Sequence, residues 1–129
     1  MHLLATYGTL KKGHSNSYLL DKAKYIGHGT TVDKFTMAGL MVYQQPATAK
    51  VVIDLWEVDD NLLKGAIDRL EGHPYSYMRR KTMVEVDGKE HEAWLYFYPD
   101  EKVEPDPARV RHLNKDGHFE WGVAEVKVA

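Results

Sequence analysis

The 129-residue sequence contains no cysteine. This absence excludes disulfide bonds, thiolate ligands for metal ions and a cysteine nucleophile. A chain without cysteine suits a reducing compartment, so we expect it to work in the cytoplasm. The beginning of the sequence has no apolar signal-peptide core, and no apolar run approaches the roughly 18 residues of a membrane span. We therefore expect no membrane partner.

The sequence also lacks a long run of one charge. Its 17 basic and 19 acidic residues are mixed along the chain, with a net charge of −2, and the longest basic run is Arg79–Lys81. Nucleic-acid binding usually requires a strongly positive surface, so we expect no nucleic-acid partner.

Several familiar catalytic and binding motifs are absent or incomplete. None of the three serines, Ser15, Ser17 and Ser76, lies in a Gly-x-Ser-x-Gly motif, which argues against a serine nucleophile. The segment 91–95 begins like a zinc-protease motif but lacks the second histidine, and 27–32 lacks the third glycine of a dinucleotide-binding loop. We predict no metal site.

What the sequence does contain is typical of a globular protein, with 43% hydrophobic and 28% charged residues. Its length predicts one domain over residues 1–129. Residues 3–7 and 50–58 read as strands, 25–43 as short bent strands, and 81–98 as a hairpin around Asp87-Gly88. The tail from His118 could supply a last strand. About six strands and one clear helix predict an α+β fold, a small curled sheet or barrel with helices at its side.

The clearest helix is predicted over residues 59–72. Asp59 or Asp60 can cap its start, and Gly72 can end it. Lys64 and Asp68, four residues apart, are expected to form an exposed surface pair. Apolar side chains recur at helical spacing, at Leu62, Leu63, Ala66, Ile67 and Leu70.

Glu71 occupies the last turn of this helix, at the edge of the apolar stripe. The negative end of the helix dipole and partial burial both oppose ionisation of a carboxylate there, which raises its pKa toward the range of a general base. A boundary glutamate with its oxygens in water explains the same position. Both interpretations stay open on the residues alone.

The segment Tyr7-Gly8-Thr9-Leu10 follows the first predicted strand. It is either a plain glycine turn or an anion-binding loop, because a glycine lets the backbone approach a ligand and successive N–H groups can point at one carboxylate.

Four fragments resemble the γ-glutamylcyclotransferase-like family, and most closely its γ-glutamylamine cyclotransferase branch. They are YGTLKKG at Tyr7–Gly13, LWEVDDNLL at Leu55–Leu63, IDRLEGHPYSYMRR at Ile67–Arg80 and AWLYFY at Ala93–Tyr98. They occur in the order of the family and at about its spacing.

The resemblance implies a compact mixed fold with a small β-barrel and flanking helices. It also implies an enzyme of the transferase or lyase class that needs no metal or cofactor. The α-amine of a small γ-glutamyl substrate attacks its own γ-carbonyl, which releases 5-oxoproline and a free amine. The catalytic glutamate of the family falls on Glu71, and its substrate-binding loop falls on Tyr7, Gly8, Thr9 and Leu10. The oligomeric state does not follow from the sequence.

The sequence departs from the family pattern in its central strand, where Ile53-Asp54 replaces the usual Gly-Glu. We expect Ile53 to narrow the pocket. Three further residues match recurring positions of the family: Tyr77, Arg79 and Tyr98. Each could have a structural role or contact a ligand. On the side of the released amine, the sequence offers aromatic candidates at Tyr75, Tyr77 and Tyr98.

A non-catalytic domain that keeps the same pocket for a small molecule or a partner is the alternative function. Retention of Glu71 together with the loop at 7–10 favours the enzyme, since a binding protein has no need of a second carboxylate beside a bound one.

Overall fold

The computed structural model describes residues 1–8 and 17–121. At its centre is a closed five-stranded barrel with the strand order β1-β5-β2-β6-β7. A parallel contact between β1 and β7, with Leu4 opposite Trp94, closes the barrel, and the other neighbours are antiparallel. The mixed barrel confirms the predicted fold class. Its strands are β1 (His2–Thr6), β2 (Lys24–Thr31), β5 (Val52–Val58), β6 (Met78–Val86) and β7 (Lys89–Phe97).

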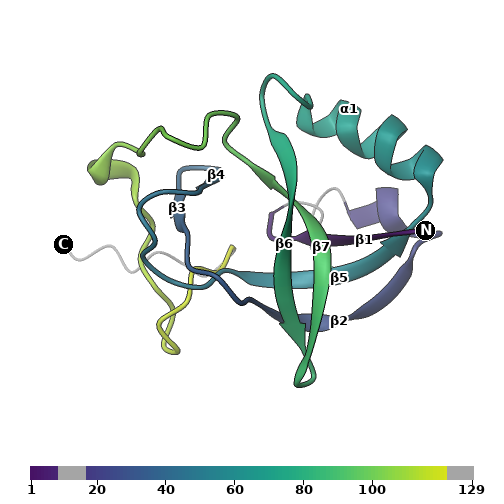
Figure 1. Cartoon of the computed structure of the whole chain (residues 1–129), viewed down its shortest axis with the longest axis horizontal. Helices are drawn as coiled ribbons and strands as arrows, with labels where there is room; N and C mark the ends of the chain where they lie inside the picture. Colours follow the sequence, from purple (N-terminus) through teal and green to yellow (C-terminus); the bar gives the residue numbers. More distant parts are fainter. Residues whose placement is uncertain (9–16, 122–129) are drawn as a thin grey trace.

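Smaller elements complete the described chain (Figure 1). The strands β3 (Thr36–Ala38) and β4 (Met41–Tyr43) form a two-stranded sheet beside the barrel. This sheet agrees with the prediction of short strands in this region. Two 3-10 helices, η1 (Ser17–Leu20) and η3 (Pro107–Arg109), lie in the connections. Of the predicted last strand, Phe119 forms an isolated bridge to Val51, and residues 122–129 lie outside the described residues.

Side chains alternate between the two faces of the barrel strands. In β5, Ile53 and Leu55 point into the barrel, while Trp56 and Val58 point outward. The interior is closely packed with apolar residues from all five strands. The outward side chains form a second cluster with Leu4 and Tyr96, which the helical segment covers. This period-two alternation therefore supplies two separate hydrophobic cores.

The predicted helix is present over residues 60–71, but its middle part, residues 62–67, is not α-helical. A π-helix, η2 (Leu62–Ile67), precedes α1 (Asp68–Glu71), and the Asp59 carboxylate accepts the Leu62 N–H at 2.7 Å, as its capping role required. Leu63 and Ile67 are fully buried against the barrel. The wider π turn changes the angular spacing of later residues. Consequently Leu70, expected in the apolar stripe, is 42% exposed.

The expected surface pair of Lys64 and Asp68 is wrong. Lys64 Nζ lies 3.2 Å from Asp60 Oδ2, one turn earlier. Asp68 is instead buried, because the helix turns it toward β6, where Arg79 binds it. Spacing along a helix predicted neighbours on its surface, and the packing of the helix decided which face was covered.

The helix ends at Gly72, which adopts the left-handed conformation with φ of 67° and ψ of 34°. The N–H of His73 donates to the carbonyl of Asp68 at 2.9 Å, and the N–H of Gly72 donates to that of Arg69 at 3.2 Å. These two bonds form a Schellman motif and confirm the predicted terminator. The motif holds Glu71 at the last helical position.

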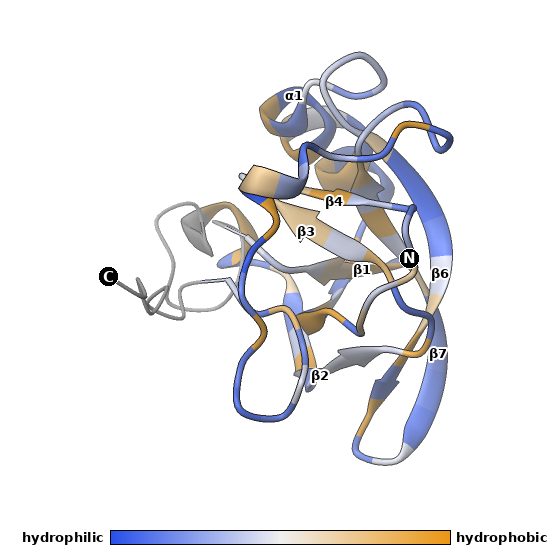
Figure 2. Ribbon diagram, turned by 90° about the vertical axis from the view of Figure 1, so that its left-hand side faces the viewer, coloured by the Kyte–Doolittle hydropathy of each residue, from blue (hydrophilic) through white to orange (hydrophobic). Residues whose placement is uncertain are grey.

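The predicted hairpin is confirmed over β6 and β7. Asp87 and Gly88 both have positive φ, of 52° and 77°, as a type I′ turn requires. Residues from Met78 opposite Phe97 to Val86 opposite Lys89 are paired without a register shift. Figure 2 shows that β6 carries hydrophilic residues along much of its length. One face of the hairpin is therefore exposed to solvent, and the other faces the interior of the barrel.

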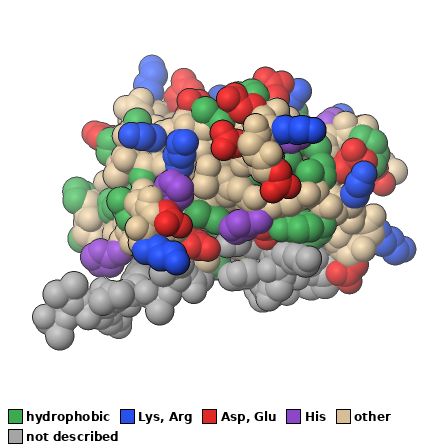
Figure 3. Space-filling model, turned by 90° about the horizontal axis from the view of Figure 1, so that it is seen from below, with side chains coloured by type: hydrophobic (Ala, Val, Ile, Leu, Met, Phe, Trp, Pro, Cys, Tyr) green, Lys and Arg blue, Asp and Glu red, His purple; other side chains and the backbone are tan. Residues whose placement is uncertain are grey.

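Charges of both signs are interspersed on the face seen in Figure 3, in line with the mixed charge of the sequence. Among residues 1–8 and 17–121, no helix has the length and apolar character needed to cross a membrane.

We predict opposite effects of alanine at two glycines of the helical segment. Gly72→Ala places a methyl group 2.8 Å from Ser76 Oγ on a backbone with positive φ, so stability should fall by about 1 kcal/mol or more. Gly65, in η2, has open space around it, so Gly65→Ala should raise stability by about 0.5–1 kcal/mol. Urea unfolding of both variants measures this. Equal effects at the two positions would contradict the proposed role of Gly72 in ending the helix.

Candidate active site

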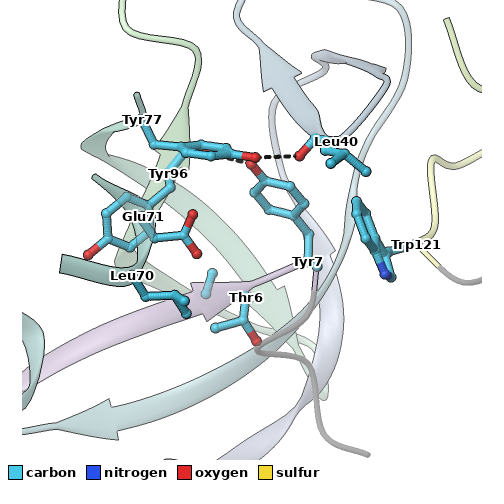
Figure 4. Close-up of a pocket in the computed structure, with 10 residues that line it drawn as sticks. Thr6, Tyr7, Leu40, Leu70, Glu71, Tyr77, Tyr96 and Trp121 are labelled. Atoms are coloured by element: carbon cyan, nitrogen blue, oxygen red, sulfur yellow. Dashed lines mark hydrogen bonds between the residues drawn. The ribbon is translucent and has the colours of Figure 1, made fainter. Parts of the chain in front are cut away.

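A cavity of about 240 Å³ lies where the end of β1 meets the end of α1 (Figure 4). It brings two predicted site residues at the end of β1, Tyr7 and Gly8, together with a third, Glu71, from a distant part of the sequence. The other wall residues come from β1, the β3–β4 turn, α1, the residue before β6, β7 and the C-terminal segment. Among residues 1–8 and 17–121, the lining consists of Ala5, Thr6, Tyr7, Gly8, Leu40, Leu70, Glu71, Tyr77, Tyr96 and Trp121.

Glu71 is the only carboxylate in this lining. Its side chain extends from the helix end into the space between the rings of Tyr7, Tyr77 and Tyr96 (Figure 4). Burial raises its pKa from 4.5 to about 7. Within residues 1–8 and 17–121, the carboxylate makes no hydrogen bond and no ion pair that would favour its charged form. Glu71 is therefore able to accept or donate a proton near neutral pH.

The three phenols around Glu71 are all engaged as hydrogen-bond donors. Tyr7 Oη donates to the carbonyl of Tyr96 and Tyr77 Oη to that of Leu40, both at 2.8 Å. Tyr96 Oη donates to Asp68 Oδ1 at 2.5 Å. These bonds fix the rings as walls of the cavity.

The phenols are also held in their neutral form. Burial raises the pKa of Tyr77 to about 12, and the negative charge of Glu71 adds to this effect. Burial likewise raises the pKa of Tyr7 and of Tyr96. Of the titratable groups in the described lining, Glu71 alone changes its charge near neutral pH.

Asp68, three residues before Glu71, has the opposite environment. Burial by itself would raise the pKa of Asp68, but hydrogen bonds from Arg79 and Tyr96 and the charge of Arg79 outweigh it and lower the pKa. Arg79 Nε lies 3.0 Å from Asp68 Oδ1, and Arg79 Nη2 lies 3.2 Å from Oδ2. One carboxylate is thus paired and ionised, and the other has no partner in the described part of the chain and titrates near neutrality.

The end of β1 is held by side-chain bonds from its neighbours. Trp56 Nε1 donates to Thr6 Oγ1 at 3.1 Å, which anchors the strand before it turns. Gly8 does not adopt the left-handed backbone conformation, so a positive φ is not the reason for a glycine at this position. A Cβ at Gly8 would lie 3.8 Å from the Trp121 ring, an ordinary contact on the cavity wall. Thr9 and Leu10 lie outside the described residues, and a substrate-binding role for this loop stays a prediction.

Several expectations about the pocket do not hold. Ile53 is buried in the barrel interior, so it does not narrow the cavity, and the next residue, Asp54, bonds with Tyr25 and His28 on the outer face. Tyr75 is 90% exposed and lies outside the cavity lining. Tyr98 stacks on Tyr43, with ring centroids 4.7 Å apart, and is also outside it.

Several wall residues carry no signal of a site in the sequence. Leu40 lies in a turn, helical spacing places Leu70 in the apolar stripe, and Trp121 belongs to a segment that predicts no more than a possible last strand. Tyr96 was part of the quoted AWLYFY fragment, and strand alternation could have placed it on the face opposite Leu95. No three histidine or acidic side chains of the described chain gather closely enough to ligate a metal ion.

Comparison with known proteins gives a consistent result. The sequence profile of the family described as "Gamma-glutamyl cyclotransferase, AIG2-like" matches residues 4–120. A protein of Methanocaldococcus jannaschii with the provisional name γ-glutamylcyclotransferase is 42% identical over 105 residues, which cover 78% of this chain and 87% of the relative. A Vibrio cholerae protein with the same provisional name is 30% identical over 99 residues, covering 75% and 82%.

The fold is shared with solved structures. The crystal structure of a mouse AIG2-like protein superposes with a TM-score of 0.74 at 23% identity, covering 93% of this chain and 95% of the mouse chain. At that identity, the likeness concerns the fold alone.

We predict that Glu71 destabilises the folded chain as the pH rises. A carboxyl group whose pKa rises from 4.5 to about 7 on folding binds an extra proton between these values, so stability is lost as the pH increases through about 7. The maximum cost is about 3 kcal/mol. Glu71→Gln should therefore unfold at higher urea concentration than the wild type at pH 8, with the difference nearly gone at pH 4.

Glu92→Gln provides the control for this prediction. The Glu92 side chain is 62% exposed, with Oε1 3.7 Å from Lys81 Nζ. It should show no comparable gain that grows with pH. A stability difference between Glu71→Gln and wild type that is constant from pH 4 to pH 8 would show that Glu71 is not desolvated.

Proposed function

The chain belongs to the AIG2-like γ-glutamyl cyclotransferase family, and we propose that it cyclises γ-glutamylamines, with Glu71 as the general acid and base. The products are 5-oxoproline and a free amine. The observation that carries the proposal is a carboxylate with a pKa of about 7, unpaired within the described chain, in a cavity of about 240 Å³. A cavity of this kind suits a small substrate and a proton transfer at neutral pH.

The proposed reaction needs proton transfers in both directions at one carboxylate. Ionised Glu71 accepts a proton from the α-ammonium group of the substrate, and the lone pair freed on that nitrogen attacks the γ-carbonyl carbon. A carbon–nitrogen bond forms and closes the five-membered ring, and the carbonyl oxygen gains negative charge. As this intermediate collapses, the bond to the leaving nitrogen breaks and Glu71 returns its proton to that nitrogen. The second proton lost by the ring nitrogen passes to the leaving nitrogen by the same route, so the amine leaves as an ammonium ion. The carboxylate is regenerated for the next turnover.

The nucleophile and the electrophile belong to the same molecule, so the protein has to fold the substrate rather than join two molecules. Intramolecular reactions of this kind gain greatly from correct orientation alone. The rings of Tyr7, Tyr77 and Tyr96 restrict the space beside Glu71. In this proposal, backbone N–H groups of the segment 7–10 receive the α-carboxylate of the substrate. The reaction as written needs no cofactor.

The leaving amine is proposed to occupy the apolar mouth of the cavity. Leu40 and Leu70 line the cavity and are 60% and 42% exposed, so their apolar side chains are accessible to a bound amine. The Trp121 ring lies on the same lining. Apolar walls discriminate weakly between amines. We therefore propose that several γ-glutamylamines are accepted, and that the protein acts in the cytoplasm.

The decisive test is the formation of 5-oxoproline by wild type and by Glu71→Gln. The amide keeps the shape of the side chain but cannot accept the proton, so kcat/KM should fall by about 10²–10⁴-fold. In the wild type, kcat/KM should rise with pH up to about 7, because only ionised Glu71 is a base. Chromatographic assay of 5-oxoproline across a panel of γ-glutamyl compounds measures both.

Glu92→Gln is again the control and should retain wild-type turnover. Unchanged turnover in Glu71→Gln would remove Glu71 from the mechanism. Binding of γ-glutamyl compounds by the wild type without any 5-oxoproline would favour the alternative, a non-catalytic binding domain.

Leu70→Ser should remove a preference for longer amines. In the wild type, kcat/KM should increase from L-glutamine through γ-glutamyl n-alkylamides, by up to about fourfold per methylene group covered. Leu70→Ser should flatten this increase and leave L-glutamine unaffected. Substrates with an α-methyl ester or an N-acetyl group should fail, because they lack the charged carboxylate or the nucleophilic amine.

Leu113→Ser is the matched control for Leu70→Ser, since Leu113 is 44% exposed and lies outside the cavity. It should keep the full chain-length dependence. Loss of this dependence in both variants, or turnover of the ester at the rate of the free acid, would contradict the proposed arrangement of the substrate.

A further inference from the structure

Tyr96 forms hydrogen bonds with residues of both elements that meet at the cavity, the end of β1 and the helix α1. Its carbonyl, on β7, accepts the hydroxyl of Tyr7 at 2.8 Å, and Tyr7 precedes Gly8 at the end of β1. Its own hydroxyl donates to Asp68 Oδ1 at 2.5 Å, and Asp68 begins the four-residue helix α1 that ends with Glu71. One residue of the barrel is therefore tied to the strand end through its backbone and to the helix end through its side chain.

The Asp68 end of this connection is held from a second strand. Arg79, on β6, binds both carboxylate oxygens of Asp68, and its guanidinium lies 4.4 Å from the centre of the Trp94 ring. Side chains of Arg79 and Asp68 are only 11% and 12% exposed. A planar guanidinium that binds both oxygens and rests on an indole ring fixes position and orientation together. Asp68 is thus a rigid point of attachment for the helix.

The backbone after Glu71 is tied to the same strand. The N–H of Arg79 donates to His73 Nδ1 at 3.3 Å, and the His73 ring lies edge-on to the Tyr96 ring, with centroids 6.4 Å apart. Contacts to β6 and β7 therefore lie on both sides of Glu71 in the sequence, at Asp68 and at His73. Glu71 itself makes no hydrogen bond within the described chain, so its carboxylate is held in place only by these neighbours and by the rings around it.

We propose that Tyr96, through its bond to Asp68, is a positioning residue that holds the Glu71 carboxylate against the ring wall of the cavity. This inference rests on the proposed function of Glu71 as general base. The Tyr96 hydroxyl points at Asp68 and away from the Glu71 carboxylate (Figure 4), so the phenol acts on the reaction through the placement of Glu71. Asp68 and Arg79 serve the same placement from the helix and from β6.

The Tyr96→Phe variant keeps the aromatic ring and the backbone carbonyl that accepts the Tyr7 hydroxyl. It loses the hydrogen bond to Asp68 and so releases the end of the helix. We expect kcat to fall by roughly 10- to 100-fold, as small displacements of a catalytic group do, while KM changes less than threefold. Water should then reach the carboxylate. The titration midpoint of Glu71, followed by NMR of a ¹³C-labelled carboxyl group, should move at least one pH unit below its wild-type value.

Tyr25→Phe is the matched control. Tyr25 Oη also donates to a buried aspartate, Asp54, at 3.2 Å, but Tyr25 lies outside the cavity lining. This variant loses a phenol–carboxylate bond of the same kind and should keep the wild-type kcat, KM and Glu71 midpoint. A purely structural role for Tyr96 would give the two variants similar kinetics once corrected for the folded fraction.

Asp68→Asn provides a second variant if Tyr96→Phe does not fold. It keeps an acceptor for Tyr96 but weakens the attachment to Arg79, and it should lower kcat and the Glu71 midpoint in the same direction. In the double variant, the loss in kcat should be smaller than the product of the two single losses, because both act through one connection. Multiplicative losses, or an unchanged Glu71 midpoint in either single variant, would overturn the proposal.

The two proposals fail in different ways. If the wild type formed no 5-oxoproline, the proposed function would fall, but the NMR midpoint would still report whether Tyr96 holds Glu71. If turnover required Glu71 and yet Tyr96→Phe behaved like Tyr25→Phe, only the positioning role would be lost.

Discussion

The packing of one helical segment against the outside of the barrel is the contact on which the site depends. Leu63 and Ile67 are fully buried there, against outward side chains of β1, β5 and β7. Two hydrophobic cores on opposite faces of the same strands result, one inside the barrel and one under the helix. The last turn of the helix brings Leu70 and Glu71 to the cavity at the end of β1. The cavity therefore needs both elements, because neither the strand nor the helix could form it alone.

Two carboxylates in one turn of α1 illustrate how the surroundings of a residue set its chemistry. Asp68 faces β6 and is bound by Arg79 and Tyr96, which lowers its pKa. Glu71 faces the cavity, where burial raises its pKa to about 7. An unpaired carboxylate in such a place lowers stability when it is ionised. A cost of this kind is typical of functional sites, where groups are held in environments that a purely structural role would not favour.

The hydrogen bonds around the cavity hold the phenol rings in place, so the phenols shape the site and do not react themselves. Each phenol of the wall donates to a carbonyl or carboxylate behind it, and so turns a ring face or edge toward the space beside Glu71. The wall is consequently apolar even though three tyrosines contribute to it. An apolar wall around one proton-transferring group is consistent with the proposed reaction, in which the substrate supplies both reacting centres. Leu40, Leu70 and Trp121 add further apolar surface to the described lining.

The sequence by itself determined the elements with strong local signals. The first strand, the central strand, the hairpin around Asp87-Gly88 and the helix from its cap at Asp59 to its end at Gly72 all follow from short-range rules of alternation, turn chemistry and capping. The residues alone leave Glu71 as either a candidate base or a boundary glutamate in water, and the family resemblance marks it as catalytic and indicates the barrel. In each of these cases, the residues that carry the signal are neighbours in the chain.

Only the tertiary structure decided which side chains meet. Helical spacing predicts that Asp68 faces solvent beside Lys64, yet Arg79 binds it from β6. The same spacing predicts that Leu70 is in the core, yet the π-helix before it changes that spacing. The family pattern predicts that Ile53 narrows the pocket, yet strand alternation turns it into the barrel. The physical reason is the same throughout: burial and pairing depend on the face an element presents to partners distant in the chain, and local sequence carries no information about those partners.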